Sequence, residues 1–263
     1  MKKLISQLDL IKSSGKPGFM MHMVAGYPDL ESSQKIATQI LESGADLLEV
    51  QIPFSDPVAD GPVIARANEI ALKNGVTVKD SLSMIQRIVG TTEKPILIMT
   101  YFNIIHHYGV ERFCKRASES GVQGLIVPDY PQDEEAHNSL IKFTRENELA
   151  FIQVVSSTTP PDRLYSIVKH AGGFVYCMAR TGITGRKTDI SPQTVAYLQA
   201  VRASCDLPLA VGFGLSEKAQ VRALKPYAEI MIVGSAMIKV YADIPLEEGL
   251  VQIKKFMKGL IEE

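Results

Sequence analysis

The chain has 263 residues, of which 46% are hydrophobic and 22% charged, and its formal net charge is −1. This composition is typical of a globular protein with one large domain or two small ones. Basic and acidic residues are nearly balanced and form no block of one sign, which argues against nucleic acid as the main partner. No apolar run is long enough to span a membrane.

Cysteine use and the N-terminal residues indicate a cytoplasmic protein. The three cysteines, Cys114, Cys177 and Cys205, lack the spacing of a metal site or a redox pair. Residues 1–16 carry early lysines but have neither the apolar core nor the small-residue cleavage site of a signal peptide. We therefore expect a reduced, cytoplasmic chain without a cysteine-bound metal.

Strand and helix patterns alternate along the chain after a leading helix over residues 2–12, which is predicted from apolar residues at helical spacing. Eight short apolar runs follow, each ended by turn-forming residues and each followed by helical patterning. The expected strands are 18–24, 47–52, 96–100, 124–127, 150–155, 174–178, 209–211 and 230–233. The expected helices are 30–43, 63–74, 78–89, 110–120, 133–147, 159–170, 191–204, 216–224 and 246–261.

Eight strand–helix units, spaced by roughly 25 to 35 residues, predict a (β/α)8 TIM barrel. We expect one domain over residues 1–263, with the leading helix as an extra N-terminal element. A doubly wound open sheet is the competing architecture. It would carry its phosphate-binding glycines after the first strand, whereas the glycine motifs of this chain come late.

The stretch from residue 46 to residue 62, DLLEVQIPFSDPVADGP, carries two candidate catalytic carboxylates. It begins as a short apolar strand and ends as a loop rich in Pro, Asp and Gly. Glu49 interrupts the apolar run, where an unpaired carboxylate is costly to bury, and Asp60 sits in the proline-stiffened loop. Side chains alternate along a barrel strand, so Leu47, Glu49 and Gln51 should face the interior near the end where TIM-barrel active sites lie.

Two interpretations of these carboxylates remain open from the residues alone. A buried acid beside an acid in a rigid loop can carry general acid–base catalysis. Alternatively, Glu49 pairs with a cation in the core and Asp60 caps the next helix, since perturbed carboxylates also occur in structural networks.

Glycine-rich segments follow the last three expected strands. They read Gly182-Ile183-Thr184-Gly185, Val211-Gly212-Phe213-Gly214 and Val233-Gly234-Ser235. Small residues let backbone N–H groups approach an anion closely, and TIM barrels commonly bind phosphate after strands seven and eight. The sequence therefore predicts a phosphate-binding end, although each glycine could instead only form a tight turn.

The remaining polar candidates are less informative. Tyr176 shares inward parity with Phe174 and Met178, and it could be structural or could make a polar contact near the carboxylates. His106 and His107 are adjacent in sequence, so their side chains diverge, and no matching third ligand accompanies them. We therefore expect no metal site.

Several longer motifs resemble the tryptophan synthase alpha subunit family. They are LLEVQIPFSDPVADGP (47–62), IMTYFN (98–103), GLIVPDYP (124–131), CMARTGITG (177–185), AVGFGLS (210–216) and IVGSAM (232–237). The resemblance covers nearly the whole chain. It implies a TIM barrel that cleaves indole-3-glycerol phosphate to indole and glyceraldehyde 3-phosphate by a retro-aldol reaction.

The resemblance also implies partners and site residues. It implies an αββα complex with a beta subunit that carries pyridoxal phosphate and receives indole, and no cofactor in this chain. The implied catalytic residues are Glu49, Asp60 and Tyr176. The implied substrate- and phosphate-binding residues are Thr184, Gly185, Phe213, Gly214, Gly234 and Ser235. The implied indole pocket consists of His22, Met99, Ile126, Val154 and Ile232, and the implied partner surface of Pro53, Asp56 and Pro57.

Three positions depart from the family pattern. Gln51 stands where glycine is usual, His22 where an aromatic or other apolar residue is usual, and Met21 where proline is usual. A buried glutamine and a buried imidazole both need hydrogen-bond partners. We expect His22 and Gln51 to hydrogen-bond to each other, directly or through one water. The alternative is that both face bulk water at the rim.

Other functions remain to be weighed. A sugar-phosphate epimerase would need metal-binding histidines at strand ends, which the sequence lacks, and an indole-glycerol-phosphate synthase would need a lysine there. Lys94 and Lys239 lie outside the expected strand tips. A third alternative is a scaffold that activates a partner without its own turnover. The intact Glu49 and Asp60 argue against this function, whereas the departures at Gln51 and His22 leave it open.

Overall fold

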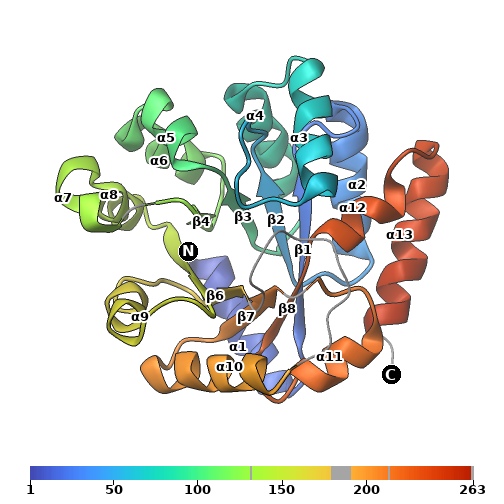
Figure 1. Ribbon diagram of the computed structural model, residues 1–263. Helices are drawn as coiled ribbons and strands as arrows, with labels where there is room; N and C mark the ends of the chain where they lie inside the picture. Colours follow the sequence, from blue (N-terminus) through green and yellow to red (C-terminus); the bar gives the residue numbers. More distant parts are fainter. Residues whose placement is uncertain (131, 179–190, 213, 262–263) are drawn as a thin grey trace.

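Eight parallel strands close into a barrel in which each strand pairs with the next one in the chain and the last pairs with the first (Figure 1). This computed structural model describes residues 1–130, 132–178, 191–212 and 214–261. The strands are β1 (Gly18–Val24), β2 (Leu47–Gln51), β3 (Ile96–Met99), β4 (Gly124–Ile126), β5 (Ala150–Ser156), β6 (Val175–Met178), β7 (Leu209–Gly212) and β8 (Ile230–Val233). Each expected strand is thus present, within one residue of its expected bounds, and the TIM-barrel prediction is confirmed.

Helices surround the barrel and connect its strands (Figure 1). They are α1 (Lys2–Ser14), α2 (Leu30–Glu42), α3 (Pro62–Lys73), α4 (Val78–Val89), α5 (Phe102–Tyr108), α6 (Val110–Glu119), η1 (Gln132–Glu134), α7 (Glu135–Asn138), α8 (Leu140–Glu146), α9 (Pro161–Val168), α10 (Pro192–Ser204), α11 (Lys218–Leu224), α12 (Ser235–Tyr241) and α13 (Leu246–Ile261). None of the helices that the structure describes is long and apolar enough to cross a membrane.

Two apolar layers follow from the alternation of side chains along the strands. In β2, Leu47 packs in the barrel interior, whereas Leu48 and Val50 belong to the layer between the barrel and the helices. The interior layer also holds Met20, Leu97 and Ile232. The inward parity predicted for β2 is therefore confirmed, and the same parity directs Glu49 into the barrel.

Helix α1 closes the amino end of the barrel. Leu4, Leu8 and Ile11 on one face of α1 pack with the interior layer. Two glycines permit this close approach: a Cβ at Gly18 would lie 2.4 Å from Ile11, and one at Gly173, whose φ is +73°, would lie 2.8 Å from Leu4. Because this end is filled by side chains, a ligand site in the barrel has to open at the carboxyl ends of the strands.

The helical layer differs from the expected one between residues 132 and 146. One continuous helix is predicted over residues 133–147, but η1, α7 and α8 occupy the stretch, and Ser139 interrupts it with a φ of +56°. The carboxylate of Glu135 accepts hydrogen bonds of 3.0 Å from the backbone N–H groups of both Ile141 and Lys142. Glu135 thereby supplies acceptors for the first turn of α8, which lets a new helix begin at the break.

Two helices of seven residues, α5 and α12, were not predicted. A helix this short spans only two turns, so it shows little of the apolar periodicity from which the longer helices were predicted. The N-terminal residue of α5 is held by its neighbours, because Phe102 donates a backbone hydrogen bond of 2.8 Å to Asp129 Oδ1 in the loop after β4.

Candidate active site

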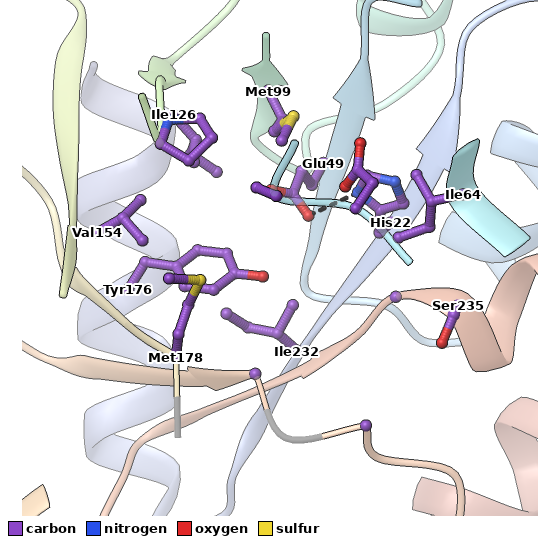
Figure 2. A pocket seen from close by; sticks show the side chains of 16 residues that line it. His22, Glu49, Ile64, Met99, Ile126, Val154, Tyr176, Met178, Ile232 and Ser235 are labelled. Atoms are coloured by element: carbon purple, nitrogen blue, oxygen red, sulfur yellow. Dashed lines mark hydrogen bonds and ion pairs between the residues drawn. The ribbon is translucent and has the colours of Figure 1, made fainter. Parts of the chain in front are cut away.

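A pocket opens at the carboxyl ends of the strands and brings most of the predicted site residues together (Figure 2). Predicted residues that line it are His22, Glu49, Asp60, Met99, Ile126, Val154, Tyr176, Gly214, Ile232, Gly234 and Ser235. Further lining residues, which were not predicted, are Ala59, Ile64, Pro128, Met178 and Gly212. The strand ends therefore converge on one concave site, as TIM-barrel active sites do.

One wall of the pocket is apolar. Met99, Ile126 and Val154 come from the ends of β3, β4 and β5, and Ile232 comes from β8. Ile64 from α3 adds to this surface. Such a wall can bury a flat apolar ring, while the polar groups that orient it come from β1, β2 and the loop after β2.

Glu49 is paired with His22 in the barrel interior. The two residues are direct neighbours across the β1–β2 ladder, and His22 Nδ1 lies 2.9 Å from Glu49 Oε2. Glu49 is 2% exposed and His22 is 4% exposed. Burial disfavours the charged imidazole and lowers the pKa of His22, but the negative charge and the hydrogen bond of Glu49, with smaller contributions from Asp60 and Gln51, raise that pKa above its usual value overall.

Asp60 is held by two other side chains. Gln51 Nε2 donates a hydrogen bond of 2.7 Å to Asp60 Oδ2, and the hydroxyl of Tyr101 donates one of 3.0 Å to the same oxygen. Burial raises the pKa of Asp60, while the bonds from Gln51 and Tyr101 and the charge of His22 oppose that rise. Burial prevails, so Asp60 is a carboxyl group that takes up a proton more readily than an exposed aspartate.

The loop after β2 is anchored at both of its ends. Tyr101 accepts a hydrogen bond of 3.1 Å from the N–H of Ala59, and its ring stacks on Phe54 at a centroid distance of 5.1 Å. Asn68 of α3 accepts a 2.9 Å bond from the N–H of Phe54. Sequence reasoning missed Tyr101 and Asn68 as site residues. The family motif IMTYFN contains Tyr101, but no local sequence pattern indicates that the Tyr101 hydroxyl hydrogen-bonds to Asp60.

Tyr176 points from β6 toward the side of the pocket where Glu49 and His22 lie (Figure 2). Burial, together with the negative charges of Glu49 and Asp60, raises the pKa of Tyr176 well above its usual value. The hydroxyl therefore stays protonated and can donate a hydrogen bond. A Cβ at Gly212 would come within 3.1 Å of this hydroxyl, so a larger residue at this position on β7 would crowd it.

The glycines of β7 and β8 lie at the other side of the same pocket. Gly214 has a φ of +67°, Gly234 precedes the first residue of α12, and the buried Ser235 begins that helix. Thr184, Gly185 and Phe213, which were also predicted to bind the substrate, lie outside the described residues. Glycine lets the backbone approach a ligand closely, so these positions suit the binding of an anion by backbone N–H groups.

The structure records no direct hydrogen bond between His22 and Gln51, although Gln51 lies close enough to raise the pKa of His22. His22 binds Glu49 and Gln51 binds Asp60, so each residue is bonded to a carboxylate. Neither faces bulk water, since His22 is 4% exposed and Gln51 is 0% exposed. The prediction considered the two strands alone, whereas the loop after β2 brings Asp60 within reach of Gln51.

The predicted partner residues lie on this loop, with different exposures. Asp56 is exposed and Pro57 is half-buried, whereas Pro53 is buried. Beside them, Val58 is 77% exposed. Among the described residues, no three His, Cys, Asp or Glu side chains gather closely enough to hold a metal ion.

A closed (β/α)8 barrel with the buried Glu49 and the partly buried Asp60 at one pocket at the strand ends has the arrangement of a TIM-barrel enzyme. Comparison with known proteins identifies the enzyme family. The family model "Tryptophan synthase alpha chain" matches residues 8–259. The tryptophan synthase alpha chain of Syntrophotalea carbinolica is 42% identical over 92% of this chain and 93% of its own.

Solved structures agree with this match. A structure of Mycobacterium tuberculosis tryptophan synthase superposes with a TM-score of 0.89 at 32% identity, covering 99% of this chain and 98% of the other. A mutant tryptophan synthase alpha subunit of Pyrococcus furiosus gives a TM-score of 0.86 at 30% identity, over 94% and 99% of the two chains. The chain belongs to the tryptophan synthase alpha chain family. Its activity is that of a lyase that cleaves indole-3-glycerol phosphate.

Proposed function

We propose that Glu49 and Asp60 are the acid–base pair of the retro-aldol cleavage, and that Tyr176 assists Glu49. The observation that carries this proposal is their convergence: two carboxylates from one strand and its loop lie in a single pocket whose opposite wall is apolar. Indole leaves only after its C3 carbon is protonated, and the charge that then develops on the ring nitrogen needs a nearby carboxylate.

The two carboxyl groups divide this work. Glu49 delivers a proton to C3, and the C–C bond then breaks as Glu49 takes the proton of the C3′ hydroxyl. Asp60 faces the indole N–H and stabilises the positive charge of the protonated ring. The hydrogen bonds of Asp60 to Gln51 and Tyr101 support this role, since they favour the ionised carboxylate. The protonated hydroxyl of Tyr176 can donate to Glu49 or to the substrate.

The substrate lies with its indole ring between the two walls and its phosphate at the ends of β7 and β8. The apolar residues Met99, Ile126, Val154 and Ile232 hold the ring, while His22 borders it on the side of Glu49. Gly214, Gly234 and Ser235 hold the phosphate with their backbone N–H groups. By the family resemblance, Thr184, Gly185 and Phe213 complete the substrate site.

The partner is a tryptophan synthase beta subunit that carries pyridoxal phosphate and receives indole in an αββα complex in the cytoplasm. The exposed Asp56 and Val58 and the half-buried Pro57 support a docking surface on the loop after β2. The buried Pro53 shapes that loop from within. Because the same loop carries Asp60, docking can alter the geometry of the active site.

Replacing Asp60 by asparagine tests the assignment. The Asp60→Asn chain should release indole from indole-3-glycerol phosphate about 10² to 10⁴ times more slowly, as expected for the loss of a group that acts on the developing charge. Glu42→Gln, at an exposed position at the end of α2, is the matched control and should leave the rate unchanged. Near-normal turnover by a folded Asp60→Asn chain would contradict the proposal.

A further inference from the structure

Two buried polar side chains, His22 and Gln51, are each hydrogen-bonded to one of the two proposed catalytic carboxyl groups. His22 on β1 is paired across the strands with Glu49 on β2, and Gln51, two residues further along β2, reaches Asp60. Side chains two residues apart on a strand lie on the same face, so Glu49 and Gln51 both point into the barrel. His22, Glu49 and Gln51 are each exposed by 4% or less.

His22 and Gln51 each keep one polar side-chain atom that makes no hydrogen bond among the described residues. His22 uses Nδ1 for Glu49, and Gln51 uses Nε2 for Asp60. His22 Nε2 and Gln51 Oε1 are buried and have no hydrogen-bond partner among the described residues. Leaving buried polar atoms unpaired is unfavourable, so the protonation state that lets them pair has an advantage.

While Glu49 is a carboxylate, the imidazolium form of His22 makes these two atoms complementary. A neutral His22 that donates through Nδ1 to Glu49 carries a lone pair on Nε2, which is an acceptor like Gln51 Oε1. A protonated His22 carries a hydrogen on both ring nitrogens, so Nε2 becomes a donor toward the glutamine side chain. Burial lowers the pKa of His22, and Gln51 contributes to the opposing rise after the larger effects of Glu49 and Asp60.

We propose that His22 is a positioning residue that stores the proton which Glu49 delivers to the substrate. The proposal rests on the proposed catalytic role of Glu49. In the resting pocket the proton is on His22 and Glu49 is a carboxylate. When an indole ring excludes water, the neutral pair is favoured over the ion pair, because separated charges are costly in a dry site.

The proton count closes over one turnover. The proton moves from His22 Nδ1 to Glu49, and Glu49 transfers a proton to indole C3. The C3′ hydroxyl then returns one proton to Glu49 as the C–C bond breaks, and this proton restores the imidazolium of His22. No net proton is gained or lost by the protein. Gln51, which is held by its bond to Asp60, can orient the His22 ring through Nε2.

Within the part of the chain that the structure describes, few titratable groups face His22. From β2 it meets Glu49, from the loop after β2 it senses Asp60, and Tyr176 of β6 shares the pocket. The other neighbouring strand, β8, presents the apolar Ile232 to the pocket. The ionisation of His22 therefore reports chiefly on Glu49 and Asp60.

A titration of the histidine ring nitrogens by NMR tests the pair without reference to activity. The chain has five histidines, and the His22 signals are those missing from a His22→Gln chain. We expect the pKa of His22 to lie above the ordinary value of about 6.5 and to fall by about one pH unit or more in Glu49→Gln. A His22 pKa at or below the ordinary value, or one that Glu49→Gln does not move, would overturn the proposal.

The pH profile of kcat/KM separates proton storage from a purely structural role. His22→Gln should lower kcat/KM for indole-3-glycerol phosphate by about tenfold to hundredfold. The high-pH limb of the kcat/KM profile of His22→Gln should also move to lower pH. Without the imidazole, the proton is held by the Glu49 carboxyl group alone, and a carboxyl group loses its proton at lower pH than an imidazolium. His106→Gln, at an exposed position on α5, is the control and should keep the parent profile.

Each outcome decides one claim. A His22→Gln chain with parent activity, or with lower activity but an unmoved pH limb, would refute the storage role. A Glu49→Gln chain that remains active would instead refute the proposed function, while the NMR result would still stand on its own. If His22→Gln fails to fold, single replacements of the other four histidines assign the His22 signals by elimination, and the titration of parent and Glu49→Gln chains still decides whether the pair exists.

Discussion

The hydroxyl of Tyr101 joins Asp60 to the loop that carries it: it donates a 3.0 Å hydrogen bond to Asp60 Oδ2 and accepts a 3.1 Å bond from the N–H of Ala59. Tyr101 follows β3, so this one group connects the end of β3 to the loop after β2. The position of Asp60 is therefore set by a neighbouring strand as well as by its own loop.

Tyr101→Phe should reduce kcat for indole release by about tenfold with a smaller effect on KM, since it loosens a group that acts in the transition state. Losing the two hydrogen bonds should also lower the free energy of unfolding by about 1 to 3 kcal/mol. Steady-state kinetics and urea unfolding measure both effects. The control is Tyr165→Phe, at a position that is 67% exposed, and it should change neither. Unchanged kinetics in Tyr101→Phe would contradict this role.

Gln51→Met should move the acid limb of the activity profile to higher pH. The Gln51 hydrogen bond opposes the raised pKa of Asp60, so its removal lets burial raise that pKa further. If Asp60 acts as a carboxylate, the chain then needs a higher pH to become active. A series of kcat/KM measurements across the acid limb checks this shift. An acid limb at the parent position would mean that Gln51 does not control the ionisation of Asp60.

The His22–Glu49 pair should make stability depend on pH in a defined direction. Because the pKa of His22 is raised in the folded state, the folded chain holds this proton more tightly than the unfolded chain. The resulting stabilisation is fully present below the unfolded pKa of about 6.5 and is lost as pH rises through the folded pKa. A tenfold difference in proton affinity between the folded and unfolded chains corresponds to about 1.4 kcal/mol of stability.

The difference in unfolding free energy between the parent chain and His22→Gln measures this stabilisation. It should be larger at about pH 6 than at about pH 9, as judged by urea unfolding at each pH. His106→Gln serves as the reference for ordinary histidine titration, since that side chain is exposed. A difference that stays constant with pH would show that the pair does not bind a proton on folding.

A competent beta subunit should accelerate indole release by this chain, since the loop after β2 connects the exposed Val58 to Asp60. Val58→Asp places a charge on that surface and should weaken the activation far more than the rate of the chain alone. Rates measured with and without beta subunit, for the parent and for Val58→Asp, check this expectation. Equal rates in the presence and absence of partner would rule out the coupling.

The barrel could be predicted because its signal is local and repeated. Each strand is a short apolar run bounded by turn residues, and the inward parity of Leu47 and Glu49 follows from alternation within one strand. The break at Ser139 could not be predicted, since it depends on the side chain of Glu135 reaching the backbone of Ile141. The short helices α5 and α12 lacked the length that makes a helical period visible.

Most of the residues that line the candidate site could be predicted from the sequence, but the hydrogen bonds between them could not. The family motifs pointed to Glu49, Asp60 and Tyr176, and the structure gathers all three in one pocket. Which atom bonds which is decided by strand register and loop reach. The contact from Tyr101 to Asp60 spans 41 positions in the chain, and no pattern in the sequence marks it.

The rate of indole release from indole-3-glycerol phosphate by Glu49→Gln tests the central claim most directly. The amide preserves the size of the side chain and can still accept a hydrogen bond from His22, but it cannot transfer a proton. We expect a folded chain whose kcat is lower by about 10² to 10⁴. Turnover within a few fold of the parent, by a chain with the parent's unfolding transition, would contradict the assignment of Glu49 as the group that protonates indole.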